Sequence, residues 1–256
     1  MCITWRVGSA RYGRGVTEAT PAAAPQARSG RILGVNHVGL SVADLEATVE
    51  ALTARQFSHI SGFAWTSGAA EVDAALGLEG SAAEVAVLQG ANAYLEVFAY
   101  SSPSPVDGAA AGVQAEWADS AAGPWLRSVR WPAADPAAVG TWWAGLTDEV
   151  GVVALDPPAA APGARPRRMC DLGGNHLCLD VIGIDAVFAT LVGRGATYGR
   201  APAPMPGGLA SVGYLWDPWG NAFELLESHD ERATLWRGRL GGSVGEPAVN
   251  GGRVGG

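Results

Sequence analysis

Two histidines and two glutamates occupy matching places in two similar stretches of the 256-residue sequence. Each histidine directly follows an asparagine, and each glutamate lies in a later apolar stretch. The four residues are His37 and Glu96 in the first stretch and His176 and Glu224 in the second. Imidazole nitrogens and carboxylate oxygens together suit Zn, Ni, Mn, Co or Fe(II). We therefore predict one divalent metal ion held by all four side chains, with two carboxylates to offset its charge.

Each of these residues also has a simpler interpretation. A histidine in a strand is often a hydrogen-bonded structural residue, and a glutamate can face solvent from a half-exposed strand. An unpaired carboxylate among apolar neighbours is costly, however, and a cation would remove that cost. The other two histidines, His59 and His229, and the glutamate Glu227 have no counterpart in the other stretch. We expect these three at the surface.

The elements that must position the four residues follow from periodicity. Apolar residues alternate after each Asn-His pair, which predicts a strand whose histidine faces away from the apolar side. Helical spacing follows, with Asp44 as the cap of the first helix and Gly195 as the left-handed stop after the second. Each glutamate lies in a later strand, and residues 217–221 (DPWGN) predict a hairpin turn. Each stretch is thus most simply a βαβββ module.

The organisation predicted from these patterns is an α+β protein of paired βαβββ modules. Residues 31–105 form the first module and residues 171–230 the second. Residues 1–30 form a leader and residues 231–256 a Gly-rich tail, both without hydrophobic periodicity and predicted to be disordered. Residues 106–170 separate the modules.

The middle segment again predicts a strand and then a helix. Residues 128–131 (SVRW) precede Asp135, and Val139, Trp142 and Leu146 follow at helical spacing. Aligning Asp135 with Asp44 puts Ser128 at the place of the first histidine, so this segment offers no ligand there. It is either a degenerate βα half-module or an insertion, and the Ala/Pro-rich residues 156–165 predict a linker after it.

Composition excludes several classes of function. The net charge is −8, and no stretch gathers arginine into a stripe, so we expect no nucleic-acid partner. No apolar run reaches the ~18 residues of a membrane span, and no secretory signal is recognisable at the start. Three cysteines without a CxxC pair argue against a disulfide framework or a thiolate zinc site. The expected location is the cytoplasm.

Four segments of the chain resemble the vicinal oxygen chelate superfamily, which includes glyoxalase I, methylmalonyl-CoA epimerase, extradiol dioxygenases, fosfomycin-resistance enzymes and bleomycin-binding proteins. They are NHVGLSVADL, LEVFAYSSP at Leu95–Pro103, NHLCLDV and DPWGNAFELLE at Asp217–Glu227. The resemblance implies a glyoxalase-like fold, in which paired modules form a cup-shaped sheet around a divalent metal. It also implies the ligand roles of His37, Glu96, His176 and Glu224.

The resemblance implies a reaction as well. Four protein ligands are typical of the glyoxalase and epimerase branch, which implies a lyase or isomerase that acts on a carbonyl-containing small molecule through a metal-stabilised enediolate or enolate. Either Glu96 or Glu224 would then leave the metal to act as the base, with Glu224 the weaker choice. Two alternatives stay open: an Fe(II) extradiol-type dioxygenase, and a non-catalytic protein that binds a drug or metabolite.

The expected partner is a small-molecule substrate. Tyr94 and Phe98 share the strand face of Glu96, and Tyr214 and Trp216 precede the last hairpin. These aromatic side chains either line an apolar substrate pocket or pack in the core. A homodimer is a further option that the sequence leaves open.

Overall fold

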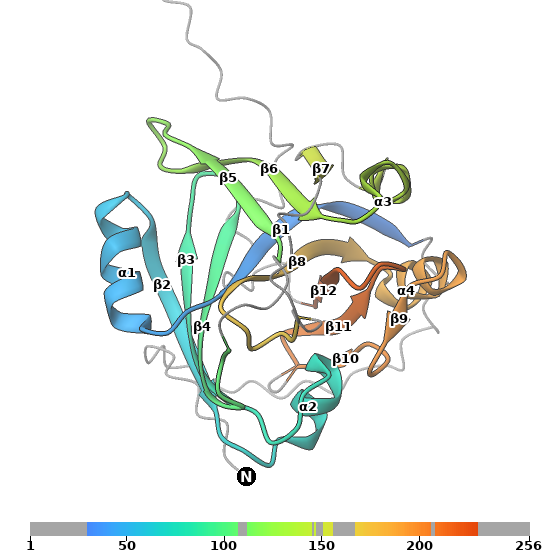
Figure 1. Ribbon diagram of the computed structural model, residues 1–256, viewed down its shortest axis with the longest axis horizontal. Helices are drawn as coiled ribbons and strands as arrows, with labels where there is room; N and C mark the ends of the chain where they lie inside the picture. Colours follow the sequence, from blue (N-terminus) through green and yellow to red (C-terminus); the bar gives the residue numbers. More distant parts are fainter. Residues whose placement is uncertain are drawn as a thin grey trace, which may run out of the picture.

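Two sheets and four helices make up the described part of the chain (Figure 1). The computed structural model describes residues 30–106, 112–144, 146, 151–155, 167–205 and 208–229. The elements are β1 (Arg31–Ser41), α1 (Leu45–Ala54), β2 (Ser58–Trp65), α2 (Ala70–Leu76), β3 (Ala82–Gln89), β4 (Tyr94–Ser102), β5 (Gln114–Ala118), β6 (Trp125–Pro132), α3 (Pro136–Trp143), β7 (Gly151–Leu155), β8 (Gly173–Ile182), α4 (Ile184–Gly193), β9 (Thr197–Tyr198), β10 (Ala203–Pro204), β11 (Ala210–Trp216) and β12 (Ala222–Ser228).

The main sheet is built from two modules that meet at its centre. Its strand order is β10-β11-β12-β8-β1-β4-β3-β2, with β9 paired to β11. Within each module the first strand runs parallel to the last, β1 beside β4 and β8 beside β12, whereas β1 and β8 are antiparallel to each other. From either edge of the sheet to its centre, the strands of each module therefore follow one another in the same kind of order, with the first strand of each module at the centre. The predicted α+β fold of paired βαβββ modules is confirmed.

The local signals of the sequence form the elements that they predict. Asp44 accepts a hydrogen bond from the backbone N–H of Ala47 at the start of α1. Gly195 has a φ of +96° after α4, a conformation that costs other residues more. Residues 217–221 connect β11 to β12 as an antiparallel hairpin.

Glu227 is half-buried and makes a contact that the sequence did not predict. Its carboxylate accepts hydrogen bonds from the backbone N–H groups of Gly183 and Ile184, at distances of 2.7 and 3.1 Å. Gly183 precedes α4 and has no side chain to cap the helix, so the glutamate of the last strand takes that place. The contact was not predictable because it joins residues more than forty positions apart in sequence.

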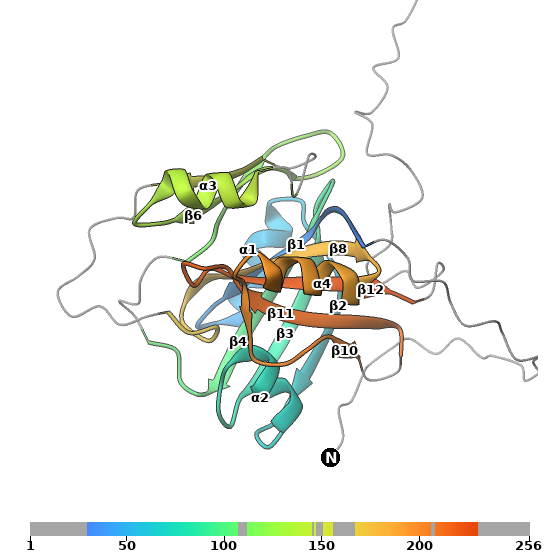
Figure 2. The ribbon, with the colours of Figure 1, turned by 90° about the vertical axis from the view of Figure 1, so that its right-hand side faces the viewer.

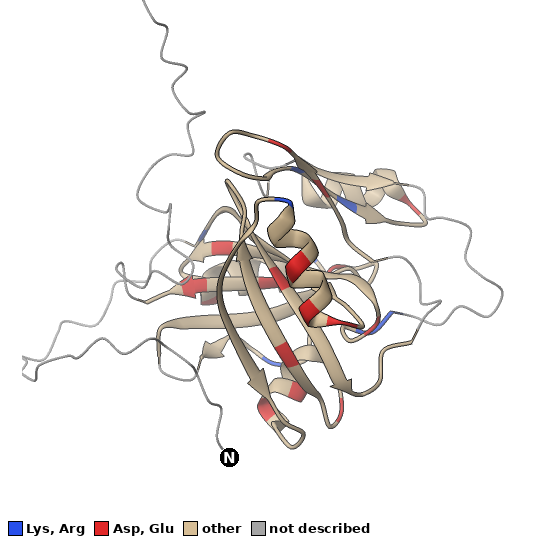
Figure 3. Cartoon of the chain, turned by 90° about the vertical axis from the view of Figure 1, so that its left-hand side faces the viewer, with Lys and Arg blue, Asp and Glu red and all other residues tan. Residues whose placement is uncertain are grey.

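Helix α2 in the first module has no counterpart in the second. It carries Glu71 and Asp73 in its first turn, and acidic residues lie on both helices of this module (Figure 3). The Asp73 carboxylate accepts hydrogen bonds from the backbone N–H groups of Gly80 and Ser81 beyond the end of the helix. These bonds fix the loop that returns the chain from α2 to β3.

The middle segment forms a layer of its own. Strands β5, β6 and β7 make a separate three-stranded sheet. Strands β6 and β7 are parallel neighbours in it, and α3 connects them along the chain. Figure 2 shows α3 and β6 on one side of the main sheet and α2 on the opposite side. The predicted strand and helix are confirmed, and Asp135 caps α3 by accepting from the N–H of Ala138. Ser128 donates to Glu116 on the neighbouring strand.

Aromatic packing attaches this layer to the second module. The rings of Trp143 and Phe223 meet edge to face with centroids 5.1 Å apart, and Trp142 stacks near the Arg194 guanidinium, 5.0 Å from the ring centre. Trp143 also donates its indole N–H to the buried Asp217 carboxylate at 3.0 Å. The same carboxylate accepts from the backbone N–H groups of Trp219 and Asn221 in the hairpin turn.

Replacing Asp217 by alanine is expected to lower the free energy of unfolding by about 2–4 kcal/mol, because the buried Trp143 indole and the N–H groups of the hairpin turn lose their acceptor together. Urea unfolding measures this loss. Asp119→Ala is the matched control, since Asp119 is exposed, and it should change stability by less than about 0.5 kcal/mol. Equal urea midpoints for the two variants would contradict a stabilising role of Asp217 between α3 and the hairpin turn.

Some predictions fall on residues outside the described part. The leader apart from Gly30, the tail 231–256 and the linker 156–165 are among them. The exact limits 31–105, 106–170 and 171–230 stay predictions. Within the described ranges, none of the helices has the length and apolar character needed to cross a membrane.

Candidate metal centre

The four predicted ligand residues lie together at the centre of the main sheet. His37, Glu96, His176 and Glu224 each offer one donor atom, and these atoms all lie within 4.8 Å of one another. The four side chains come from the four central strands β1, β4, β8 and β12. All four residues are buried, with exposed fractions of 4% or less. The sequence pattern thus identified residues that the fold brings together.

The spacing of the donor atoms fits a divalent ion. The two Nε2 atoms of His37 and His176 are 2.9 Å apart. Glu224 Oε2 is 3.3 Å from the first and 3.2 Å from the second, and Glu96 Oε2 is 3.2 and 3.8 Å from them. Bonds of ~2.1 Å around one ion would separate adjacent donors by about 3.0 Å in an octahedron and about 3.4 Å in a tetrahedron. Only small movements are needed to hold an ion.

Gly39 makes room for this arrangement. It pairs with Glu96 on one side and with His176 on the other, at the middle of the sheet. A Cβ atom at this position would lie 2.3 Å from Nδ1 of His176 and 2.0 Å from Oδ1 of Asn175. Any larger residue would therefore displace the His176 ring.

Two asparagines support the histidines, and sequence analysis did not assign them a role. Asn36 Oδ1 is 2.9 Å from Nδ1 of His37, and Asn175 Oδ1 is 2.7 Å from Nδ1 of His176. Both asparagines are buried. The repeated Asn-His dipeptide was the signal that could have identified them.

The electrostatics of the centre favour a bound cation. Burial alone would lower the pKa of His37, but the charge of Glu96 and hydrogen bonds to both glutamates raise it from 6.5 to about 10. Burial would raise the pKa of Glu224, but hydrogen bonds from His176 and His37 lower it from 4.5 to about 2. A proton on His37 therefore balances part of the carboxylate charge wherever a metal ion does not.

Metal binding between pH 7 and 9 is expected to release about one proton per ion, because a ligand nitrogen must be unprotonated. The raised pKa means that His37 keeps its proton through this range and up to about pH 10. Apparent affinity should therefore rise with pH in the same window. Titration calorimetry in buffers of different ionisation enthalpy measures the released proton, and heats independent of the buffer would contradict this expectation.

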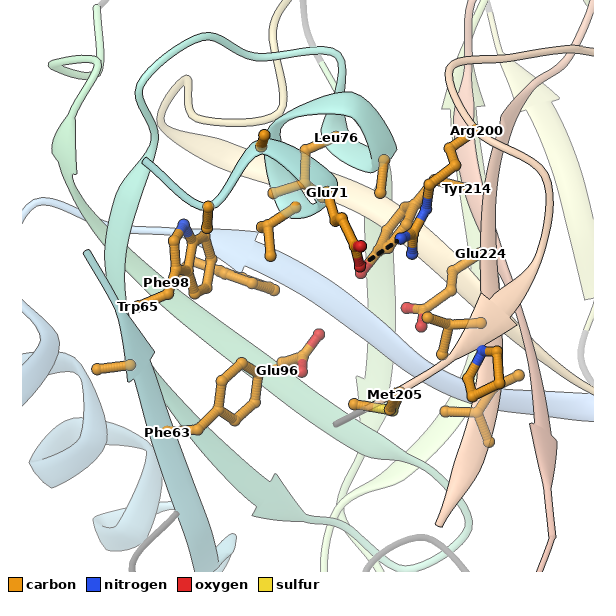
Figure 4. A pocket seen from close by; sticks show the side chains of 18 of the residues that line it. Phe63, Trp65, Glu71, Leu76, Glu96, Phe98, Arg200, Met205, Tyr214 and Glu224 are labelled. Carbon is orange, nitrogen blue, oxygen red and sulfur yellow. Dashed lines mark hydrogen bonds and ion pairs between the residues drawn. The ribbon is translucent and has the colours of Figure 1, made fainter. Parts of the chain in front are cut away.

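A cavity of about 440 Å³ opens from the metal centre between the two halves of the main sheet and α2. Figure 4 shows Glu96 and Glu224 facing this space from opposite sides. Its lining is mostly apolar and includes Phe63, Trp65, Leu76, Phe98, Met205 and Tyr214. Among the described residues of the middle segment, none lines it.

Two of the four predicted pocket residues line the cavity. Phe98 and Tyr214 do so, and their rings meet His176 edge to face at 5.9 and 5.4 Å. Tyr94 and Trp216 are not among the lining residues. The cavity extends along β4 from Glu96 toward Phe98, so Tyr94 lies beyond its other end. Trp216 packs near Gly77 at the end of α2 instead.

The rim of the cavity carries one ion pair. Arg200 Nη1 is 3.2 Å from Glu71 Oε2 on α2, and the dashed line in Figure 4 marks this contact. Apart from the metal centre, Glu71, Arg200 and Tyr214 are the lining residues with polar side chains among the described residues. The cavity is thus apolar between a charged floor and a charged rim.

Comparison with known proteins finds similarity in three-dimensional structure only. No family model matches the sequence, and no curated protein matches it. Glyoxalase I from Zea mays is 12% identical, with 78% of this chain and 92% of that chain covered and a TM-score of 0.45. Methylmalonyl-CoA epimerase from Mycobacterium tuberculosis is 16% identical, with coverages of 78% and 90% and a TM-score of 0.39. A hypothetical protein from Bacillus halodurans is 12% identical, with coverages of 80% and 98% and a TM-score of 0.38.

The arrangement of the central strands accounts for the candidate site. Two βαβββ modules meet through antiparallel first strands, and their central strands bring two histidines and two glutamates to one point. This architecture is the α+β fold of paired βαβββ modules that the sequence predicts, with the four candidate ligands at its centre.

Proposed function

We propose that this protein is a divalent-metal-dependent lyase or isomerase of the glyoxalase-like type, acting on a carbonyl-containing small molecule. The observation that supports this most is a buried group of two imidazoles and two carboxylates, three of which, His37, Glu96 and Glu224, line an apolar cavity. A divalent ion held there would polarise a carbonyl oxygen and stabilise the negative charge that develops on it.

His37 and His176 hold the ion in this proposal, and a glutamate moves the proton. Glu96 is our choice for the base. Its carboxylate oxygen is 3.8 Å from His176 Nε2, whereas that of Glu224 is 3.2 Å from the same atom. The more loosely held carboxylate is the easier one to turn toward a substrate C–H bond. Glu224 would stay a ligand if Glu96 is the base, and it is the second candidate for that role.

The cavity walls favour a substrate with an apolar body. Phe98 and Tyr214 stand next to the centre, and Phe63, Trp65 and Leu76 continue the wall toward α2. These side chains exclude water from the reacting atoms and bind rings or alkyl groups. The cation at the rim, Arg200, is already paired with Glu71, so the lining offers little to a ligand with several charged groups.

Elemental analysis of protein purified without chelators tests the proposal. We expect about one Zn, Ni, Co or Mn ion per chain. The loaded protein should then exchange the hydrogen next to the carbonyl of an aromatic α-hydroxy ketone for solvent deuterium, measured by NMR. Treatment with a chelator should stop the exchange, and readdition of metal should restore it.

Two outcomes would replace this proposal with another function. Bound Fe(II) together with oxygen uptake on a catechol would favour an extradiol-type dioxygenase. Tight binding of apolar compounds that survives complete removal of metal, without exchange of any hydrogen, would favour a protein that sequesters a drug or metabolite.

Location, partner and oligomeric state are also proposals. We propose a cytoplasmic protein with a small-molecule substrate, and a homodimer is an option that light scattering would decide. Within the described residues Cys170 and Cys178 are buried thiols that are not joined by a disulfide.

A further inference from the structure

Each supporting asparagine is anchored by a residue of the opposite module. Asn36 donates from Nδ2 to both carboxylate oxygens of Asp180, at 3.0 Å each. Asn175 donates from Nδ2 to the hydroxyl oxygen of Ser41 at 2.9 Å. Ser41 and Asp180 occupy equivalent places, each five residues after the asparagine of its own strand. Ser41 and Asp180 thus occupy matching positions in the two modules but differ in charge.

With Asp180 as a carboxylate, the contacts behind His37 determine one assignment of protons. A carboxylate such as Asp180 only accepts hydrogen bonds, so the Asn36 atom that faces it must be the NH₂ group. The amide oxygen of Asn36 then faces the ring, and it also only accepts. Nδ1 of His37 must therefore carry a hydrogen, which leaves Nε2 to face the metal centre.

The hydrogen bonds behind His176 also end at a group that only accepts. The backbone carbonyl of Met169 only accepts, so the Ser41 hydroxyl donates to it at 2.9 Å. The Ser41 oxygen is then free to accept from the Asn175 amide, whose own oxygen accepts from Nδ1 of His176. All of the side chains in both chains of contacts are buried, with exposed fractions of 6% or less. These side chains are therefore shielded from bulk water.

We propose that Asn36 and Asn175 are positioning residues that hold both histidines in the Nδ1–H form, and that the Asp180 carboxylate makes His37 the stronger nitrogen donor of the two. This inference rests on the proposed metal centre. A carboxylate polarises the amide of Asn36 more than a hydroxyl polarises that of Asn175, which makes the Asn36 oxygen the better acceptor. A stronger bond at Nδ1 raises the donor strength of Nε2 on the same ring.

The first test compares Asn36→Ala and Asn175→Ala by Zn²⁺ competition against a chelator of known affinity. Both variants should bind Zn²⁺ about 10- to 100-fold more weakly, the range for the loss of a group that orients a ligand, and Asn36→Ala should lose more. Asn92→Ala is the matched control. Asn92 also makes two hydrogen bonds, but both are to the backbone of Leu126 and neither involves a ligand histidine. The Asn92→Ala variant should therefore keep wild-type Zn²⁺ affinity.

The second test isolates charge from shape. Asp180→Asn keeps an oxygen for the Asn36 amide but removes the negative charge, and it should weaken Zn²⁺ binding about 3- to 10-fold. Long-range ¹H–¹⁵N spectra of the Zn²⁺-loaded protein report ring protonation directly, and the chain has only four histidines to assign. Nδ1 should carry hydrogen on both ligand rings, and Asp180→Asn should move the ring nitrogen signals of His37 more than those of His176.

The outcomes separate this inference from the proposed function. Folded asparagine variants with wild-type Zn²⁺ affinity, or Nε2–H forms in the loaded wild-type protein, would overturn the inference and leave the metal centre standing. Equal effects of Asp180→Asn on both rings would overturn the asymmetry. Failure of the wild-type protein to bind Zn²⁺, Ni²⁺ or Co²⁺ at all would overturn the metal centre itself.

Discussion

The variant with both His37→Ala and His176→Ala is expected to lose divalent metal binding and turnover together. The two imidazoles come from the antiparallel central strands and supply both nitrogen donors of the centre. Without them two buried carboxylates remain, and these cannot complete a four-donor site. Metal content after dialysis should fall from about one ion per chain to none, and each single variant should weaken binding by more than the about 100-fold of a lost orienting group.

The controls for this experiment are the two histidines outside the centre. His59 is exposed, and its ring bonds to the backbone carbonyl of Ser61. His229 bonds to the Ser211 hydroxyl at the far end of β11. His59→Ala and His229→Ala should both keep the full metal content. A double ligand variant that still holds metal would end the proposal of a four-residue centre, and one that loses metal but keeps ligand affinity would indicate a binding protein.

Glu96→Gln is expected to reduce turnover about 10²- to 10⁴-fold, the usual contribution of a positioned base, while the protein still takes up metal. Glutamine keeps the shape of the side chain and one oxygen that can face an ion, but it cannot accept a proton from carbon. Metal affinity should fall because one negative charge is lost from the centre. Hydrogen exchange of an aromatic α-hydroxy ketone in D₂O, measured at saturating metal, separates the two effects.

Two further glutamates make this test specific. Glu84→Gln on the neighbouring strand β3 changes an exposed residue and should leave both rate and affinity unchanged. Glu224→Gln should lower metal affinity at least as much as Glu96→Gln does, with a smaller loss of rate once metal is saturating. The reverse pattern would assign the base to Glu224, and full exchange in Glu96→Gln would exclude Glu96 from proton transfer.

The sequence predicted most of what depends on local signals. The caps at Asp44 and Asp135 and the turn at residues 217–221 are each determined within a few residues, and all three form as expected. The four candidate ligands were predicted from the matching positions in two similar stretches, because matching positions predict matching places around a shared centre. This is why four residues far apart in sequence could be grouped before their positions were known.

Features that depend on the contact between distant segments were not predictable. Glu227 caps α4, Trp216 packs against the end of α2, and Asp180 anchors Asn36 from across the sheet. None of these contacts has a local sequence pattern. Helix α2 was missed because it is only seven residues long and begins without a side-chain cap. The set of residues that line the pocket depends on how the two halves of the sheet are placed relative to each other. The pattern of residues along a single strand does not specify this placement.

The crossed anchoring of the two asparagines has a consequence for assembly. Each half supplies two donor atoms and also the group that steadies the other half's imidazole. Neither half is self-sufficient, so two separately expressed fragments should capture an ion only after they have found each other. Because one chain carries both halves, that encounter is an intramolecular event in this protein.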